Sequence, residues 1–287
     1  MLKRAVFCLA SAILVAAGLF YTLVHPHNVP VSSSTAMDSC RTLVLKKRTA
    51  FKELGSSDVT CTGMTWDPVD RKLWAADQGL EEHPSSRLVE YDLEQGKVSK
   101  VLDISGILEE GADLQGLAYD DEEDAFWIAS GSFVHLVSRS GDLLRSFPMG
   151  PVFAWQANGI AYDRSEDVLW IVCRSKAVVK TDKNGHILSW IPCSWKGQDH
   201  IAVKGGSLYI TAGCDYQGDD NFILRYGKDS GKLEQIWRTA GSYSVEGIVF
   251  TEDACIIAND GLYHEDRYRQ SYLSFYDRLP LLQQAAS

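Results

Sequence analysis

The chain has 287 residues, of which 45% are hydrophobic and 23% charged, so it is long enough for one large domain or two small ones with a sizeable core. This composition excludes an intrinsically disordered chain. The formal net charge of −10 comes without any basic block, which argues against nucleic acid as a partner.

The first 24 residues predict a transmembrane helix that anchors the protein. Residues 5–24 carry no charge and are long enough to span a bilayer, and Lys3 and Arg4 precede them. By the positive-inside rule, these two charges place the N-terminus in the cytoplasm and the rest of the chain in the periplasm or the extracellular space. A cleaved signal peptide followed by secretion is the alternative, although the best cleavage site ends only at Ala36.

Residues 25–40 are rich in proline and serine and are expected to form a linker. Six cysteines lie beyond the apolar stretch, and this even number permits disulfides in an exported domain. We expect two pairs, Cys40–Cys61 and Cys193–Cys214, because each would join neighbouring edges of the repeats described next. Buried free thiols are the alternative.

A phrase of about 15 residues recurs five times within residues 41–287 and predicts the architecture of this domain. The copies occupy residues 62–77, 115–130, 158–173, 199–213 and 246–260. Each copy has a β-rich run, a turn of polar residues or glycine, and a second β-rich run that often contains tryptophan, which together predict a β-hairpin. A further strand pair follows several hairpins. Four antiparallel strands roughly every 40–50 residues are typical of a propeller blade.

The repeats therefore predict an all-β propeller of five four-stranded blades. Six blades are the alternative, if residues 41–61 form a blade of their own. We expect residues 42–54 instead to supply outer strands to the last blade and so close the ring, which removes exposed strand edges.

A polar residue stands directly before the glycine, or its equivalent, in every copy of the phrase. These residues are Thr62, Gln115, Asn158, Asp199 and Glu246. Since the innermost strands of a propeller surround its axis, we expect the five side chains to converge at one end of the central channel. Carboxylate and amide oxygens are the ligands that calcium prefers. Gln115, Asn158, Asp199 and Glu246 are therefore candidate calcium ligands, and a hydrated channel mouth without metal is the alternative.

The loops after the second strand of each hairpin emerge at the same end and carry the candidate ligand-binding residues. These are Asp77, Arg174, Asp215, Asp260 and His264. His200 stands where the other copies have glycine. It and Asp199 are the candidate catalytic residues, because neighbouring acids tune a histidine for general-base work. A structural histidine that fills space is the alternative.

The repeated phrase, the apolar N-terminal segment and the five repeats resemble the bacterial SdiA-regulated family of envelope propellers over roughly residues 42–278. This resemblance implies a membrane-anchored propeller outside the cytoplasm and supplies no defined activity. The ring is also similar to the calcium site of the gluconolactonase, paraoxonase and strictosidine synthase propellers, in which such residues hold a metal that polarises a lactone or ester. Asn158, Asp199 and Glu246 match that pattern, whereas those enzymes have six blades and a glycine where His200 stands here.

Two functions follow from these observations. The first is a binding or scaffold module, with or without a central calcium ion, whose ligand is a small molecule, a peptide or an envelope component. The second is a calcium-dependent hydrolase of lactones or esters, with phosphate-ester or nucleotide hydrolysis as a third option. The sequence contains no GxSxG elbow, P-loop or HExxH motif, which favours the binding module.

Overall fold

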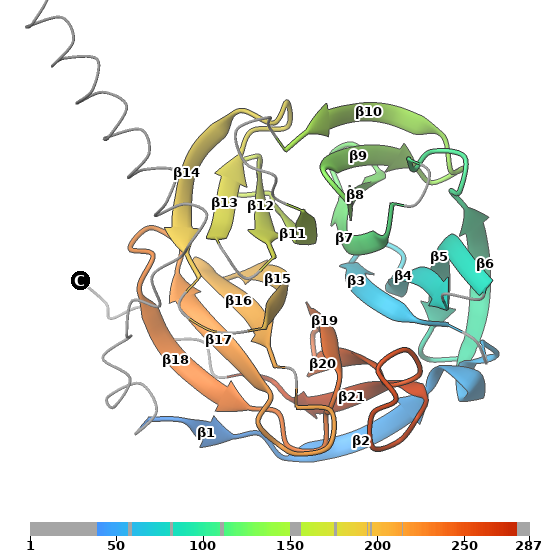
Figure 1. The fold of residues 1–287 in the computed structure, drawn as a ribbon, viewed down its shortest axis with the longest axis vertical. Helices are drawn as coiled ribbons and strands as arrows, with labels where there is room; N and C mark the ends of the chain where they lie inside the picture. The colour runs from blue at the N-terminus through green and yellow to red at the C-terminus, as the bar shows by residue number, and fades with distance from the viewer. Residues whose placement is uncertain are drawn as a thin grey trace, which may run out of the picture.

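Five β-sheets surround a central axis in the computed structural model (Figure 1). The structure describes residues 39–56, 59–80, 83–109, 112–149, 156–174, 177–193, 195, 197–213 and 215–279. The architecture is therefore the predicted all-β propeller of five blades. Among the described residues, no helix is long and apolar enough to cross a membrane. The predicted anchor, residues 1–24, and most of the predicted linker lie outside the described residues.

Each of the first four blades is built from four consecutive antiparallel strands, innermost strand first. Blade 1 contains β3 (Cys61–Asp67), β4 (Lys72–Leu80), β5 (His83–Asp92) and β6 (Lys97–Asp103). Blade 2 contains β7 (Leu114–Asp120), β8 (Ala125–Ser130), β9 (Phe133–Ser138) and β10 (Leu143–Pro148). Blade 3 contains β11 (Ala157–Asp163), β12 (Val168–Cys173), β13 (Ala177–Thr181) and β14 (Ile187–Pro192). Blade 4 contains β15 (Gln198–Lys204), β16 (Ser207–Ala212), β17 (Phe222–Gly227) and β18 (Leu233–Arg238).

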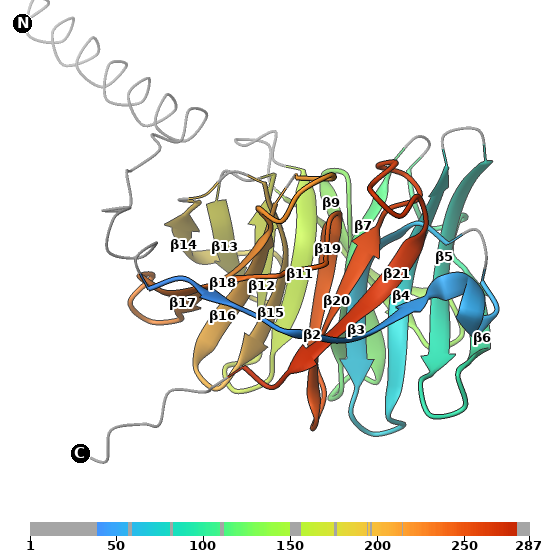
Figure 2. The ribbon, with the colours of Figure 1, turned by 90° about the horizontal axis from the view of Figure 1, so that it is seen from below.

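Blade 5 joins the two ends of the domain. Its inner strands are β19 (Val245–Phe250), β20 (Ala254–Asp260) and β21 (Ser271–Asp277), and its outermost strand is β2 (Leu45–Ala50) from the start of the domain. Figure 2 shows β2 running along the outside of β21. The predicted closure is thus confirmed, and the segment offered as a sixth blade instead forms β2 and the short 3₁₀ helix η1 (Phe51–Leu54).

The first strand of the domain does not join blade 5, as residues 42–54 were expected to do. β1 (Arg41–Thr42) lies parallel to β18, so it adds a fifth strand to the sheet of blade 4. The start of the domain is therefore paired with both of the last two blades.

The repeated glycine is explained by the close approach of neighbouring inner strands. A Cβ atom on Gly159 would lie 2.5 Å from the carbonyl oxygen of Asp199 and 2.6 Å from the Cα of His200, both backbone atoms of the next blade. Gly63 and Gly116 face the backbone of the next inner strand in the same way. Glycine is thus required by packing at the axis, because any side chain at these positions would push two blades apart.

The hydrophobic core lies between the blades. The second strand of each hairpin is mostly buried, and β8, β12 and β16 are buried along their whole length. Trp170 of β12, for example, packs in one cluster with Leu208 and Ile210 of β16 in the next blade. These residues alternate with positions that face the preceding blade, so each sheet contributes side chains to two core layers.

Three interfaces between blades are joined by a buried ion pair, which we call the inter-blade clamp. In each clamp, the last residue of an inner strand is an aspartate that binds a basic side chain of the following blade. The pairs are Asp67 with Arg139, Asp120 with Lys183 and Asp163 with Lys228. The same aspartates accept backbone N–H groups of their own hairpin turns, as Asp120 does from Glu122 and Glu123. Each clamp therefore fixes a turn and a neighbouring blade with one carboxylate.

The predicted disulfide between Cys40 and Cys61 is wrong, because both residues are free thiols. Cys40 packs against the core cluster between blades 3 and 4, whereas Cys61 lies at the start of β3 in a cluster shared by blades 1 and 5. Cys193 is also a free, buried thiol, and its expected partner Cys214 lies outside the described residues. Burial raises the pKa of Cys193 to about 12, so this thiol is protonated at neutral pH.

Candidate functional site

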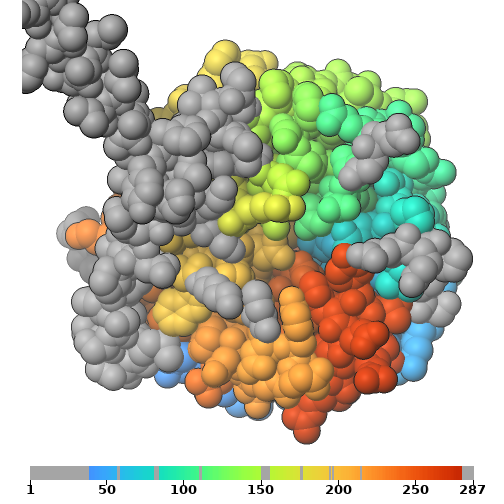
Figure 3. Space-filling model, in the orientation of Figure 1, coloured from blue at the N-terminus to red at the C-terminus, as the bar shows by residue number. Residues whose placement is uncertain are grey.

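The predicted polar ring lies at the starts of the inner strands. Each ring residue is the second residue of its strand. The five inner strands all run in the same direction along the axis, so their starts lie at the same end of the propeller. Figure 3 shows this end of the propeller, where the loops that contain residues 215–221 (orange) and 261–270 (red) lie near the axis. We call this end the polar mouth.

Three of the four candidate calcium ligands line one cavity of the polar mouth. Asn158, Asp199 and Glu246 come from β11, β15 and β19, and the cavity between them has a volume of about 340 Å³. Asn158 Nδ2 donates a hydrogen bond to Asp199 Oδ1 at 2.8 Å. The amide oxygen of Asn158 thereby remains an acceptor. Arg174, from the loop after β12, lines the same cavity.

The fourth candidate, Gln115, lines a smaller neighbouring cavity of about 110 Å³ that shares Asn158 and Arg174 with the first. Its side-chain nitrogen donates to Gln78 Oε1 at 3.2 Å. Thr62 plays a different part, because its hydroxyl donates to the carbonyl oxygen of Leu114 at 2.7 Å and is buried. The ring is therefore a cluster of three residues with Gln115 beside it.

His264 provides one wall of the larger cavity. Its Nε2 lies 3.1 Å from Glu246 Oε1, and its ring stacks on Tyr216 with centroids 4.5 Å apart. Burial lowers the pKa of His264 below the usual value for histidine, although Asp199 and Asp266 oppose that shift. The imidazole is thus neutral at pH 7, and its contact with Glu246 is a hydrogen bond between a neutral ring and a carboxylate.

Two predicted ligand-binding aspartates are buried away from this cavity. The Asp77 carboxylate accepts from Arg87 Nη2 at 2.5 Å and from the backbone N–H of Thr60 at 2.9 Å, so it holds the start of β3. Asp260 is also fully buried and accepts from Ser271 Oγ at 3.1 Å. Burial raises the pKa of Asp260 to about 7.

Asp215 shapes its own loop. Its two carboxylate oxygens accept from the backbone N–H groups of Gly218 at 2.8 Å and Asp220 at 3.1 Å. That loop carries Tyr216 into the cavity. Of the five predicted ligand-binding residues, Arg174 and His264 therefore line the cavity, and Asp215 supports its wall.

The two candidate catalytic residues have different surroundings. Asp199 lines the cavity, whereas His200 is buried and is not among the residues that do. Burial lowers the pKa of His200 to about 4, and within the described residues neither ring nitrogen has a hydrogen-bond partner. Its backbone N–H donates to Thr211 Oγ1 at 2.9 Å. These contacts suit the structural alternative for His200 better than the role of a base.

A hard cation would find suitable ligand types in the mouth, namely two carboxylates and amide oxygens. Within the described residues, no three His, Cys, Asp or Glu side chains form a group that could hold a metal. A calcium ion would therefore depend on Asn158 and on backbone or water oxygens in addition to Asp199 and Glu246.

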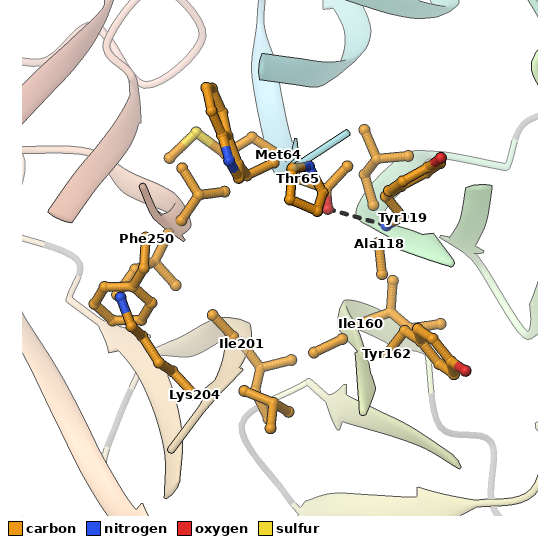
Figure 4. A pocket seen from close by; sticks show the side chains of 17 residues that line it. Met64, Thr65, Ala118, Tyr119, Ile160, Tyr162, Ile201, Lys204 and Phe250 are labelled. Atoms are coloured by element: carbon orange, nitrogen blue, oxygen red, sulfur yellow. Dashed lines mark hydrogen bonds between the residues drawn. The ribbon is translucent and has the colours of Figure 1, made fainter. Parts of the chain in front are cut away.

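Sequence reasoning missed the opposite end of the channel, where a cavity of about 310 Å³ is lined mainly by hydrophobic residues. Figure 4 shows the ring of side chains that surrounds it. The inner strands contribute one apolar residue each directly after the glycine position, namely Met64, Leu117, Ile160, Ile201 and Ile248. Thr65 Oγ1 accepts from the backbone N–H of Tyr119 at 2.9 Å across two blades. The available signal was aromatic residues three positions after the glycine, as in Trp66 and Phe250.

Comparison with known proteins gives only distant likenesses. No family model and no curated protein matches the chain. Similar solved structures include hydrazine synthase of Kuenenia stuttgartiensis, at 13% identity and a TM-score of 0.46, with 71% of this chain and 56% of that chain covered. Virginiamycin B lyase of Staphylococcus aureus is 18% identical, with a TM-score of 0.45 and coverage of 75% and 65%. A protein of unknown function from Bacteroides caccae is 11% identical, with a TM-score of 0.49 and coverage of 69% and 70%.

The chain spans less than two thirds of the length of the first two of these proteins. Likeness at this level assigns no activity, ligand or partner to this chain. The resemblance to SdiA-regulated propellers and to calcium-dependent lactonases therefore stays a prediction.

Proposed function

We propose that this propeller is a ligand-binding module whose site is the polar mouth, and that calcium binds there. The observation that supports this most directly is the convergence of Asn158, Asp199 and Glu246, from three separate blades, on one cavity of about 340 Å³. Such a volume suits a small molecule, the end of a peptide or a group on an envelope component. Two carboxylates favour a cation or a ligand that carries hydroxyl or ammonium groups.

Calcium is expected to raise the melting temperature of the isolated domain. A ligand at one hundred times its Kd stabilises the folded state by about 2.7 kcal/mol, which corresponds to roughly 5–10 °C for a domain of this size. The double variant Asp199→Asn, Glu246→Gln should lose this rise, because amides replace the two carboxylates. Differential scanning calorimetry at increasing calcium concentrations measures the effect.

The matched control for this experiment is Asp229→Asn, which changes an exposed aspartate of the turn between β17 and β18. That variant should respond to calcium as the unchanged protein does. The metal proposal is contradicted if millimolar calcium leaves the melting temperature unchanged, or if the double variant shows the same rise.

One observation favours a second candidate function, the hydrolysis of lactones or esters. His264 is neutral, held by Glu246 and exposed to the same cavity as Asp199, so it is better placed than His200 to accept a proton from water. The same protein preparations, assayed with lactones, aryl esters and nucleotides with and without a chelator, separate the two functions. Turnover that disappears in His264→Gln and persists in Asp229→Asn would establish the hydrolase.

We also propose that residues 1–24 retain the domain on the outer side of a membrane, as the SdiA-regulated resemblance implies. The support is the uncharged stretch of residues 5–24 behind Lys3 and Arg4. In bacterial cells that produce the full chain, the protein is expected in the membrane fraction with the propeller accessible to protease outside the cytoplasm. An N-terminus that begins near residue 37 in the soluble exported fraction would overturn the anchor in favour of cleavage.

A further inference from the structure

Within the part of the chain that the structure describes, neither interface of blade 5 has an inter-blade clamp. At the position of Asp67, Asp120 and Asp163, blade 4 has Lys204 and blade 5 has Thr251, four residues after the glycine position. Blade 5 receives its outermost strand from the start of the domain. It therefore has no turn between its third and fourth strands that could bring a basic residue to blade 4. Blade 1 has such a turn, residues 93–96, but the turn carries no basic residue, and blade 5 offers it Thr251 instead of an aspartate.

An apolar groove lies where the clamp between blades 5 and 1 is missing. Its volume is about 520 Å³, and its apolar walls come from both blades. These wall residues are Trp66, Leu93, Phe250, Ala254, Ile256 and Phe275. Trp66, Pro68, Lys204 and Phe250 also line the apolar channel cavity described above, so the groove and the channel are neighbours.

The charges around this groove are paired, with one exception. Arg71 binds Glu252 at 3.3 Å and lies 3.7 Å from Glu94. Asp253 binds Arg278 at 3.0 Å. Within the described residues, the ammonium of Lys204 has no carboxylate within 4 Å, whereas Arg71 is shared by two glutamates, so Lys204 is the basic group in the groove lining that is not already paired.

Lys204 lies at the boundary between the two cavities. Its Nζ is 4.9 Å from the centre of the Phe250 ring, a contact that holds the ammonium over an aromatic face (Figure 4). The side chain is half-buried, and burial lowers the pKa of Lys204 below the usual value for lysine. A carboxylate beside this ammonium would offset its desolvation, because an opposite charge favours the charged form.

We propose that the groove and the channel cavity form a second ligand site for a hydrophobic carboxylate, with the carboxylate on Lys204 and its alkyl or aryl tail against Trp66, Phe250 and Phe275. This site lies at the end of the channel opposite the polar mouth, so it is independent of the ligand proposed there. Its specificity would come from the Lys204 ammonium beside the apolar walls of the groove, since small-molecule pockets combine apolar walls with a few placed polar groups.

Isothermal titration with decanoate, kept below its micelle concentration, tests this site in the isolated domain. We expect one saturable decanoate per chain, and binding at least tenfold weaker for decanol and for decyltrimethylammonium, which lack the negative charge. Lys204→Met keeps the length of the side chain without its charge and should weaken decanoate binding at least tenfold while leaving decanol binding unchanged. Lys97→Met, an exposed lysine in β6 of blade 1, should change neither.

A second variant tests the groove itself. Ala254→Phe fills the cavity from a half-buried position without changing charge, so it should weaken decanoate and decanol alike. Unchanged melting temperatures show that both variants are folded. The proposal is overturned if decyltrimethylammonium binds as tightly as decanoate, if Lys204→Met binds decanoate normally, or if binding begins only at the micelle concentration. The double variant Asp199→Asn, Glu246→Gln should bind decanoate normally, which separates this site from the polar mouth.

Discussion

Asp120→Ala is expected to lower the free energy of unfolding by about 3–5 kcal/mol, the range seen when one partner of a buried ion pair is removed. The carboxylate is fully buried and lies 2.9 Å from Lys183 Nζ. It also accepts from the indole N–H of Trp127 at 3.0 Å and from two backbone N–H groups of its own turn. The change leaves the indole and the two turn N–H groups without this acceptor, whereas Lys183 keeps Asp167 at 2.6 Å. Urea denaturation of the isolated domain measures the loss.

Two further variants identify the cause of this loss. Asp120→Asn keeps an acceptor for the turn while removing the charge opposite Lys183, and should lose roughly half as much as alanine. Glu122→Ala, in the same turn but exposed, should change stability by no more than about 0.5 kcal/mol. If the alanine variant at position 120 were as stable as the one at 122, the inter-blade clamp would not stabilise the ring.

Gly159→Ala is expected to destabilise the propeller by about 3 kcal/mol, at the upper end of the effect of overpacking. The new methyl group would lie 2.5 Å from the carbonyl oxygen of Asp199, which is backbone and has no rotamer into which to move. Blades 3 and 4 would have to separate at the axis. The same denaturation experiment measures the effect, and calcium binding should weaken with it because Asp199 carries the proposed site.

Gly106→Ala is the matched control, since a Cβ atom there would meet nothing within 4 Å. Its φ is not in the left-handed region, so alanine should be neutral or slightly stabilising through the unfolded chain. Equal losses at residues 106 and 159 would mean that backbone entropy, and not contact between blades, explains the glycine.

The sequence was sufficient to predict the blades because each hairpin repeats the same local pattern. Strands of alternating apolar and polar residues, polar turns and a tryptophan in the second strand are all local patterns of neighbouring residues. Because the pattern occurs five times, it predicts five blades. The closing strand was also predictable, since an open ring would expose the edge of β21. The parallel pairing of β1 with β18 could not be predicted, because a strand of two residues is too short to show a pattern that identifies its partner.

The candidate site was predicted only in part, because residues at the same end of the propeller have different neighbours. Asp77 lies near the end of β4 and Arg174 directly after β12, yet Arg174 is exposed at the cavity while Asp77 is enclosed by Arg87 and Thr60. The distance in sequence from the repeated glycine predicts at which end of the propeller a residue lies. Whether a charge there is free to bind a ligand depends on partners that come from other parts of the chain.

The apolar end of the channel could not be predicted for a related reason. The groove beside Lys204 lies between blades 5 and 1, where Thr251 stands in place of the clamp aspartate, and its walls are known only once blade 5 is placed against blade 1. The predicted Cys40–Cys61 pair was wrong for a similar reason, since β1, which begins directly after Cys40, pairs with blade 4, whereas Cys61 begins the inner strand of blade 1.

The pairing of β2 with β21 also determines the order in which the protein is completed during synthesis. Residues 45–50 leave the ribosome early, but their partner strand begins at Ser271, near the end of the chain. Until then β2 has an unsatisfied edge, and the core between blades 5 and 1 has no second wall. Blades 1 to 4 are each built from consecutive residues and are able to assemble as they emerge, whereas the ring closes last.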